Sequence, residues 1–109
     1  MISIDDFKKL EIKIGHIIAV EKVPDTDKLL KLSVDFGEVA GPRQIISGIS
    51  GFFSDPQVLV GKKCAFATNL EPRTIRGLES QGMILAVSGQ NFFSLLETST
   101  DVVSGSMVK

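Results

Sequence analysis

The stretch LLKLSVDF, residues 29–36, decides the fold class of this chain. From Leu30 onward, apolar residues recur at every second position and polar residues stand between them. A period of two places alternate side chains on opposite faces of an extended chain. Residues 30–36 are therefore predicted to form a strand with one face in the core and one face in solvent.

The segments on either side of this strand extend it into a sheet. Upstream, residues 24–27 have turn chemistry, and residues 10–23 form an alternating strand interrupted by Gly15, which predicts a bulge or bend. Downstream, residues 37–42 form a hairpin loop and residues 43–47 return as a third strand. The first half of the chain is thus predicted to be a three-strand meander.

The second half begins with a helix signal. Ser54 or Asp55 can cap a short helix that begins at Pro56 and ends at a glycine. A fourth strand is predicted over residues 63–68 and a fifth over residues 83–87. The residues between these two strands, from Asn69 to Gly82, are predicted to form a polar loop.

Short elements are expected at both ends of the chain. Ser3 and Asp6 have the spacing of a capping box and predict a short amphipathic helix. Residues 92–96 and 107–108 are predicted to form a closing strand pair. No internal repeat or linker interrupts the chain, so residues 1–109 are expected to form one domain.

This order of elements predicts an all-β fold. Three meandering strands, a helix and two further strands define an OB-fold, a five-stranded barrel with a helix between strands 3 and 4. The short N-terminal helix and a C-terminal strand extension are added to this barrel. An SH3-like barrel is the alternative, although it usually lacks that helix.

Composition limits the kinds of function. Among 109 residues, 12 Lys and Arg stand against 13 Asp and Glu, so no global positive field attracts polyanions, and a nucleic-acid role needs a local site. No segment resembles a signal peptide or reaches the roughly 20 apolar residues of a membrane span. With one cysteine and no disulfide, the chain is expected to be soluble, outside the membrane and cytoplasmic.

The chemistry-bearing residues argue against an enzyme. His16 and Cys64 are the only histidine and the only cysteine, and each lies on a strand pattern without a partner nearby in sequence. Neither a catalytic triad, a metal-ligand cluster, a Gly-x-Gly-x-x-Gly motif nor a phosphate loop is present. No catalytic residue, metal or cofactor is therefore expected, and a small hydrolase is disfavoured.

Two loops could bind a nucleic acid. OB-folds bind through strands 2 and 3 and the loops joining strands 1–2 and 4–5. The first region carries Lys22, Lys28 and Lys31, with Arg43 on the adjacent strand. From charge alone, the favoured interpretation is that these basic residues lie on ordinary solvated loops and bind no ligand. Since Trp and Tyr are absent and the seven Phe mostly face the core, a folded RNA recognised by shape is a better fit than a stacked single strand.

Four blocks of the chain resemble those of a known family: TDKLLKLSVDFGE (26–38), RQIISGI (43–49), LVGKKCAFATNLEPRTIRG (59–77) and ESQGMILA (79–86). The family is the tRNA-binding domain found at the C-terminus of methionyl-tRNA synthetases and in stand-alone structure-specific tRNA-binding proteins. The resemblance runs from Ile4 to Met107. Related domains occur in the phenylalanyl synthetase beta chain, in endothelial monocyte-activating polypeptide and in a bacterial secretion-chaperone-like family.

The resemblance implies a non-catalytic domain that binds folded tRNA and assists an aminoacyl-tRNA synthetase, most closely the methionyl type. The tRNA-contacting positions it implies are Lys28, Lys31, Asn69, Arg73, Arg76, Ser80 and Met83. Cations suit phosphates, and amide and hydroxyl groups suit ribose or base edges. Met83 fits either an RNA contact or the start of a core strand. The chain departs from the family pattern in a longer hairpin at residues 38–42 and in Gln81, where Glu is common.

The resemblance also implies a homodimer formed through the region beyond the barrel. The apolar residues available for it are Phe92, Phe93, Leu95, Leu96, Val102 and Val103. The expected partners are therefore tRNA, a second copy of the chain and an aminoacyl-tRNA synthetase. The alternative function is a chaperone-like or protein-interaction OB dimer that binds peptides.

Overall fold

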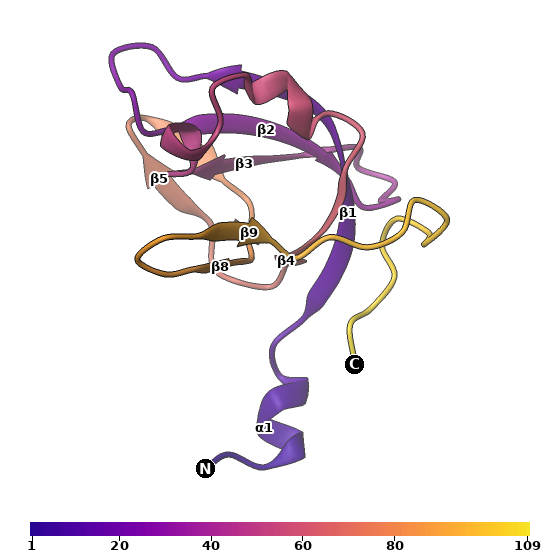
Figure 1. Ribbon diagram of the computed structural model, residues 1–109. Coiled ribbons are helices and arrows are strands. Elements are labelled where there is room, and N and C mark those ends of the chain that lie inside the picture. Colours follow the sequence, from indigo (N-terminus) through magenta and orange to yellow (C-terminus); the bar gives the residue numbers. More distant parts are fainter.

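A five-stranded antiparallel sheet curls into a barrel in the computed structural model, which describes residues 1–109 (Figure 1). Its strands, in spatial order, are β3 (Arg43–Ser47), β2 (Leu30–Asp35), β1 (Ile12–Lys22), β4 (Lys63–Ala67) and β7 (Met83–Ile84). The two outer edges approach each other, because the Gln81 amide donates to the Gln44 carbonyl at 2.8 Å. This nearly closed barrel confirms the predicted OB-fold.

The long strand β1 belongs to both sides of the barrel. Residues 12–16 pair with β4, whereas residues 16–22 pair with β2, and the register shifts between Ile17 and Ala19. The bulge predicted at Gly15 therefore falls just beyond it. Close packing requires a glycine at position 15, because a Cβ there would lie 2.5 Å from Val34 Cγ1 and 2.6 Å from the Phe36 ring.

The barrel interior is filled by the alternating apolar residues of the strands. In β2 the burial alternates residue by residue, as residues 30–36 predict. Phe66 of β4 is fully buried and meets Phe36 edge-to-face with ring centroids 5.3 Å apart. Cys64 is part of the same core, so the cysteine packs as a small apolar residue.

The connecting helix predicted from Pro56 is a short 3-10 helix, η2 (Pro56–Leu59), and a second one that was not predicted, η1 (Ser50–Phe52), precedes it. Asp55 caps η2 as expected, because its Oδ1 accepts a hydrogen bond from the Gln57 amide at 3.1 Å. Four residues are too few to propagate an α-helix, and a 3-10 turn forms instead. The fully buried Leu59 anchors η2 on the barrel.

The predicted polar loop at residues 69–82 is wrong in its structure. It contains a hairpin made of β5 (Arg73–Ile75) and β6 (Leu78–Ser80), which projects from the barrel wall. The predicted fifth strand is also divided, into β7 and β8 (Ala86–Ser88), because the chain leaves the barrel at Leu85. This second part begins another hairpin.

The chain termini pair differently from the prediction. β9 (Phe93–Leu95) pairs with β8, and not with residues 107–108. The latter reach β1, where Met107 bridges Lys13 and the Val108 amide donates to the Ile12 carbonyl at 2.8 Å. The C-terminal segment therefore extends the barrel wall.

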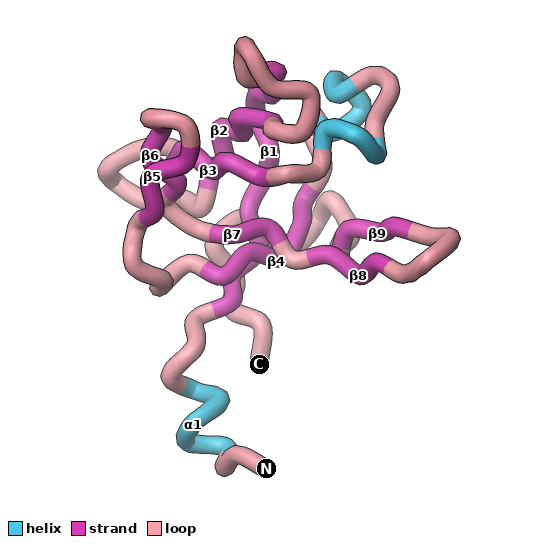
Figure 2. The backbone as a smooth tube through the Cα atoms, turned by 90° about the vertical axis from the view of Figure 1, so that its left-hand side faces the viewer, coloured by secondary structure: helices cyan, strands magenta, loops and turns pink.

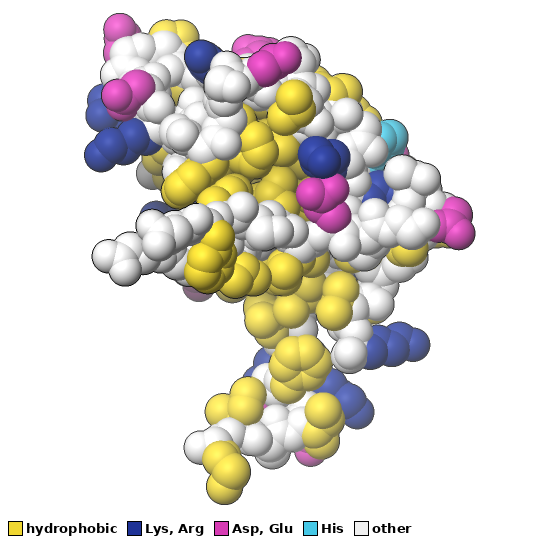
Figure 3. Space-filling view, in the orientation of Figure 1, with side chains coloured by type: hydrophobic (Ala, Val, Ile, Leu, Met, Phe, Trp, Pro, Cys, Tyr) yellow, Lys and Arg dark blue, Asp and Glu magenta, His cyan; other side chains and the backbone are white.

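The N-terminal helix α1 (Ile4–Lys8) forms as predicted, with a capping box between Ser3 and Asp6. It projects away from the barrel and has no buried residue (Figure 2). Hydrophobic side chains are visible where the barrel meets this helix (Figure 3). Neither α1 nor any other helix has the length and apolar character of a membrane-crossing segment.

Candidate nucleic-acid interface

The β5–β6 hairpin turns through only two residues, Arg76 and Gly77. Both have positive φ, at 54° and 78°, and Ile75 pairs with Leu78 across the turn. This geometry fits the right-handed twist of the two strands, and it favours Asn or Gly at its first position. Holding an arginine there costs roughly 1 kcal/mol or more. The hairpin thus presents a guanidinium at its tip despite that cost.

The base of the hairpin is fastened to β3 by a pair of glutamines. The Gln44 amide donates to Gln81 Oε1 at 2.9 Å, and Gln44 Nε2 donates to the Glu79 carbonyl at 2.9 Å. With the Gln81–Gln44 backbone bond, these contacts fix the direction in which the hairpin projects. Its side chains are therefore carried by a well-anchored element.

Ser80 is buried in the seam between β6 and β3. Its Oγ accepts a hydrogen bond from the Ile46 amide at 3.0 Å and donates to the Gly82 carbonyl at 3.0 Å. Both capacities of the hydroxyl are used inside the barrel. Ser80 therefore positions the hairpin and does not present a free group to solvent.

Asn69 is likewise engaged within the protein. Its Oδ1 accepts from the Glu11 amide at 2.7 Å, and its Nδ2 donates to the Lys9 carbonyl at 2.7 Å. The side chain joins the end of β4 to the segment between α1 and β1. Asn69 therefore sets the entry to the hairpin loop.

The predicted cations fall into paired and unpaired groups. Arg73, Arg76 and Lys28 are exposed and have no carboxylate within ion-pair distance, whereas Lys31 lies 3.5 Å from Glu21. The loop that carries Lys28 and the β5–β6 hairpin both lie at the left of Figure 1. Lys and Arg side chains are visible at that edge in Figure 3, with Asp and Glu side chains among them. The unpaired cations are free to meet phosphates.

Arg43 lies on β3 beside the Lys31 strand as expected, but its guanidinium is engaged within the protein. Its Nε and Nη2 donate to the two carboxylate oxygens of Glu38 at 2.7 and 2.8 Å. Its Nη1 donates to the carbonyls of Thr68 at 2.6 Å and Gln81 at 3.1 Å. The hydrogen bonds from Arg43 to the Glu38 carboxylate lower the pKa of Glu38. The guanidinium holds the β2–β3 loop against both ends of the hairpin segment.

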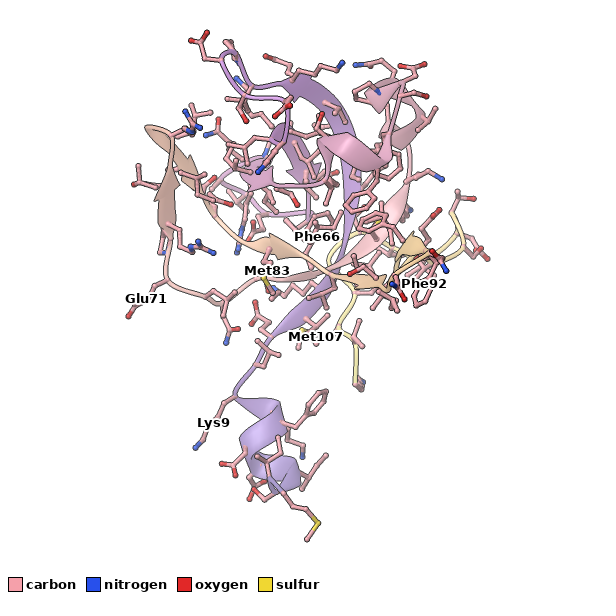
Figure 4. All side chains as sticks on the ribbon, turned by 60° about the vertical axis from the view of Figure 1, so that its left-hand side comes forward. Lys9, Phe66, Glu71, Met83, Phe92 and Met107 are labelled. Atoms are coloured by element: carbon pink, nitrogen blue, oxygen red, sulfur yellow. The ribbon has the colours of Figure 1, made fainter.

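Met83 lies on the surface beside the hairpin. Met83 begins the barrel strand β7, as the core-strand alternative expects, yet it is 45% exposed, so its side chain is also available for an RNA contact. A depression of about 50 Å³ is lined by Met83, Ile46, Leu70 and Arg73 among others. Figure 4 shows Met83 and Glu71 on this side of the molecule, away from Phe92. The site thus combines unpaired cations with one flexible apolar contact.

The side chains of this region do not form a catalytic group. Burial raises the pKa of the Cys64 thiol to about 11, so it is protonated at neutral pH and is a poor nucleophile. No three His, Cys, Asp or Glu side chains are grouped as metal ligands. The arrangement can bind an anionic polymer through cations on a fixed hairpin.

Fold and surface together define a class: a small OB-fold barrel with arginines on a projecting hairpin. The chain belongs to the family described as putative tRNA binding domain, which matches residues 12–107. It is 49% identical over 108 residues to a methionine–tRNA ligase of Methanospirillum hungatei, covering 99% of this chain and 16% of that protein. With a Lactiplantibacillus plantarum methionine–tRNA ligase it shares 41% identity over 107 residues, covering 98% and 16%.

Solved structures agree with this membership. A MetRS-related protein from Pyrococcus horikoshii superimposes with a TM-score of 0.92 at 35% identity, covering 100% of this chain and 98% of that one. A CsaA chaperone from Bacillus anthracis matches with a TM-score of 0.85 at 24% identity, covering 100% and 99%. The second likeness shows the fold alone. The chain spans only 16% of the length of the ligases named above.

Proposed function

We propose that this chain is a non-catalytic, structure-specific tRNA-binding domain that serves an aminoacyl-tRNA synthetase of the methionyl type in the cytoplasm. The observation that supports it most is the arginine hairpin, whose unpaired guanidiniums project from an anchored element in a member of the tRNA-binding family. Residues 1–109 act in this proposal as one OB domain. By holding tRNA close to its enzyme, the domain raises the local concentration of substrate.

The proposal gives the predicted site residues two roles. Arg73, Arg76 and Lys28 contact phosphates, and Met83 supplies an apolar contact. Lys31 joins them when its exposed partner Glu21 releases it, because a surface ion pair is worth at most about 1 kcal/mol. The remaining two, whose side chains are bound internally, position the contacts: Asn69 and Ser80.

Folded tRNA is expected to bind better than a single-stranded RNA of equal length. The cations sit on a fixed hairpin and suit phosphates held at set positions, whereas sequence-tolerant single-strand binders stack successive bases on several aromatic residues. Filter binding of both RNAs at one salt concentration measures the preference. Equal affinities would contradict recognition of a folded shape. Saturable binding of unfolded polypeptide without any tRNA binding would select the chaperone-like alternative.

A second copy of the chain is proposed to cover α1 and the groove beside it. An isolated helix of five residues is unstable in water, yet α1 buries nothing in the monomer. Ile4, Leu10 and Met107 line an apolar groove of about 340 Å³ at this end. Phe92 and Val103, in the segment implied by the resemblance, are also exposed. A contact through these residues would give a symmetric dimer.

Sedimentation velocity at micromolar concentration is expected to show a dimer. Replacing Ile4 by Glu should shift it toward monomer, because a charge would enter the apolar contact. Val39→Glu, on an exposed loop elsewhere, is the matched control and should leave the dimer unchanged. A wild-type protein that sediments only as a monomer would refute the proposed dimer.

A further inference from the structure

Two phenylalanines far apart in the sequence form a stacked pair on the surface. The rings of Phe52 in η1 and Phe93 in β9 are nearly parallel, at 5°, with centroids 4.0 Å apart. Phe53 braces Phe93 edge-to-face at 5.9 Å. Phe93 is half-buried against the core, whereas Phe52 is 56% exposed. The stack therefore ends in an aromatic ring that reaches solvent.

This pair lies in an open groove of about 500 Å³, bounded by η2 and the β8–β9 hairpin. Hydrophobic side chains gather in this hollow in Figure 3. The charged residues that line it are Lys62 and Glu97, which pair with each other at 3.0 Å. No unpaired carboxylate lines the groove, so an anionic ligand meets no uncompensated negative charge there.

The groove is physically connected to the cationic surface. The Ser50 amide, in η1, donates to the Lys28 carbonyl at 3.1 Å, so η1 rests on the loop that carries Lys28. The same stretch of chain begins in β3, where Ile46 is bonded to Ser80 of the arginine hairpin. Only three residues separate Ile46 from Ser50. The aromatic pair and the cations are therefore carried by elements bonded to one another, within reach of one bound RNA.

We propose that Phe52, backed by Phe93, is a stacking platform for one unpaired base of the bound folded RNA. The inference rests on the proposed tRNA-binding function and adds a base contact to a surface that otherwise offers only phosphate and apolar contacts. Folded RNAs expose unpaired bases in loops and at their ends, and such bases stack on aromatic rings. Phe93 holds the Phe52 ring in place, which reduces the ordering cost of binding.

The absence of tryptophan from the chain allows a direct test of the stacking contact. In Phe52→Trp the single indole reports on its own surroundings, and stacking of a base should quench its fluorescence as folded tRNA is added. Val39→Trp is the matched reporter, since Val39 is exposed on the β2–β3 loop and lies outside the groove, and it should show little quenching. A blunt RNA duplex with every base paired should not quench the indole at position 52.

Affinity gives a second, independent readout. Phe52→Ala should weaken tRNA binding roughly 5- to 150-fold, the range for loss of one stacked base. The slope of affinity against salt should stay unchanged, because no charge is removed. Val39→Ala, on the exposed β2–β3 loop, is the control and should bind as the wild type does. Thermal melting of each variant establishes that it is folded.

The outcomes separate this inference from the function on which it rests. Wild-type tRNA binding together with normal affinity of Phe52→Ala and an unquenched indole would overturn the platform and leave the tRNA-binding proposal standing. Absence of wild-type tRNA binding would overturn both. Quenching of the position-52 indole by an unfolded polypeptide, and not by tRNA, would identify the groove as a peptide site and also overturn the platform.

Discussion

Replacing Arg73 and Arg76 together by Gln is expected to weaken the binding of folded tRNA roughly 10- to 100-fold, if each exposed contact contributes about 0.7 to 1.4 kcal/mol. The salt dependence should change as well, because each lost phosphate contact lowers the slope of log affinity against log salt by about 0.7 to 0.9. Titrations at several salt concentrations measure both effects. The fold should survive, since exposed substitutions usually change stability by within about 0.5 kcal/mol.

Two control variants make this result specific. Lys8→Gln with Lys9→Gln removes the same amount of charge from α1 and its end. With its dimer verified by sedimentation velocity, this variant should keep a tRNA affinity within a few-fold of wild type. Met83→Ala removes no charge, so affinity should fall while the salt slope stays fixed. Unchanged affinity in the double arginine variant would show that the hairpin is not the contact surface.

Loss of the Arg43 guanidinium is expected to have the largest effect on stability. Arg43→Met leaves the Glu38 carboxylate and the carbonyls of Thr68 and Gln81 without their donor. The expected cost is about 2 to 3 kcal/mol, below the 3 to 5 kcal/mol of a fully buried pair, because both side chains are partly exposed. Urea denaturation followed by circular dichroism measures it.

The pH dependence of stability identifies the cause. Hydrogen bonds from Arg43 are the main reason that the pKa of Glu38 is lowered from its ordinary value of 4.5. A lowered carboxyl pKa stabilises the fold above the unfolded-state value, and that stabilisation is lost as pH falls through the folded-state value. Arg43→Met should therefore lose less stability than wild type below pH 4.5. Arg43→Lys should be intermediate, since an ammonium cannot reproduce the bidentate fork. Identical acid profiles would contradict this account.

Elements specified by their own residues could be predicted from the sequence. The alternation in residues 30–36 and the turn before it are local, and β2 and β3 appear where they are expected. The β5–β6 hairpin was missed because its strands have three residues each and carry polar side chains typical of a loop. The signal that could have revealed it is Arg76-Gly77 between Ile75 and Leu78, a two-residue turn sequence with apolar flanks.

The pairing of distant segments could not be predicted. Met107 pairs with Lys13 and Phe93 stacks on Phe52, and no periodic pattern in the sequence predicts either contact. The same limit applies to the site. The residue type of Ser80 suggests a hydrogen-bonding contact, but its partner Ile46 is 34 positions away, and only the folded chain shows that the hydroxyl is already used.

Asn69 connects two surfaces whose proposed roles are separate. Its amide group joins the start of the hairpin segment to the chain just after α1 through two bonds of 2.7 Å. In the proposed dimer, α1 lies at the symmetric contact. The two Asn69 hydrogen bonds then hold each hairpin at a set distance from the twofold axis. The two hairpins of the dimer are then held at a fixed distance from each other. An RNA would be selected by whether the spacing of its phosphates matches the distance between the two hairpins. A flexible strand would gain little affinity from the second hairpin.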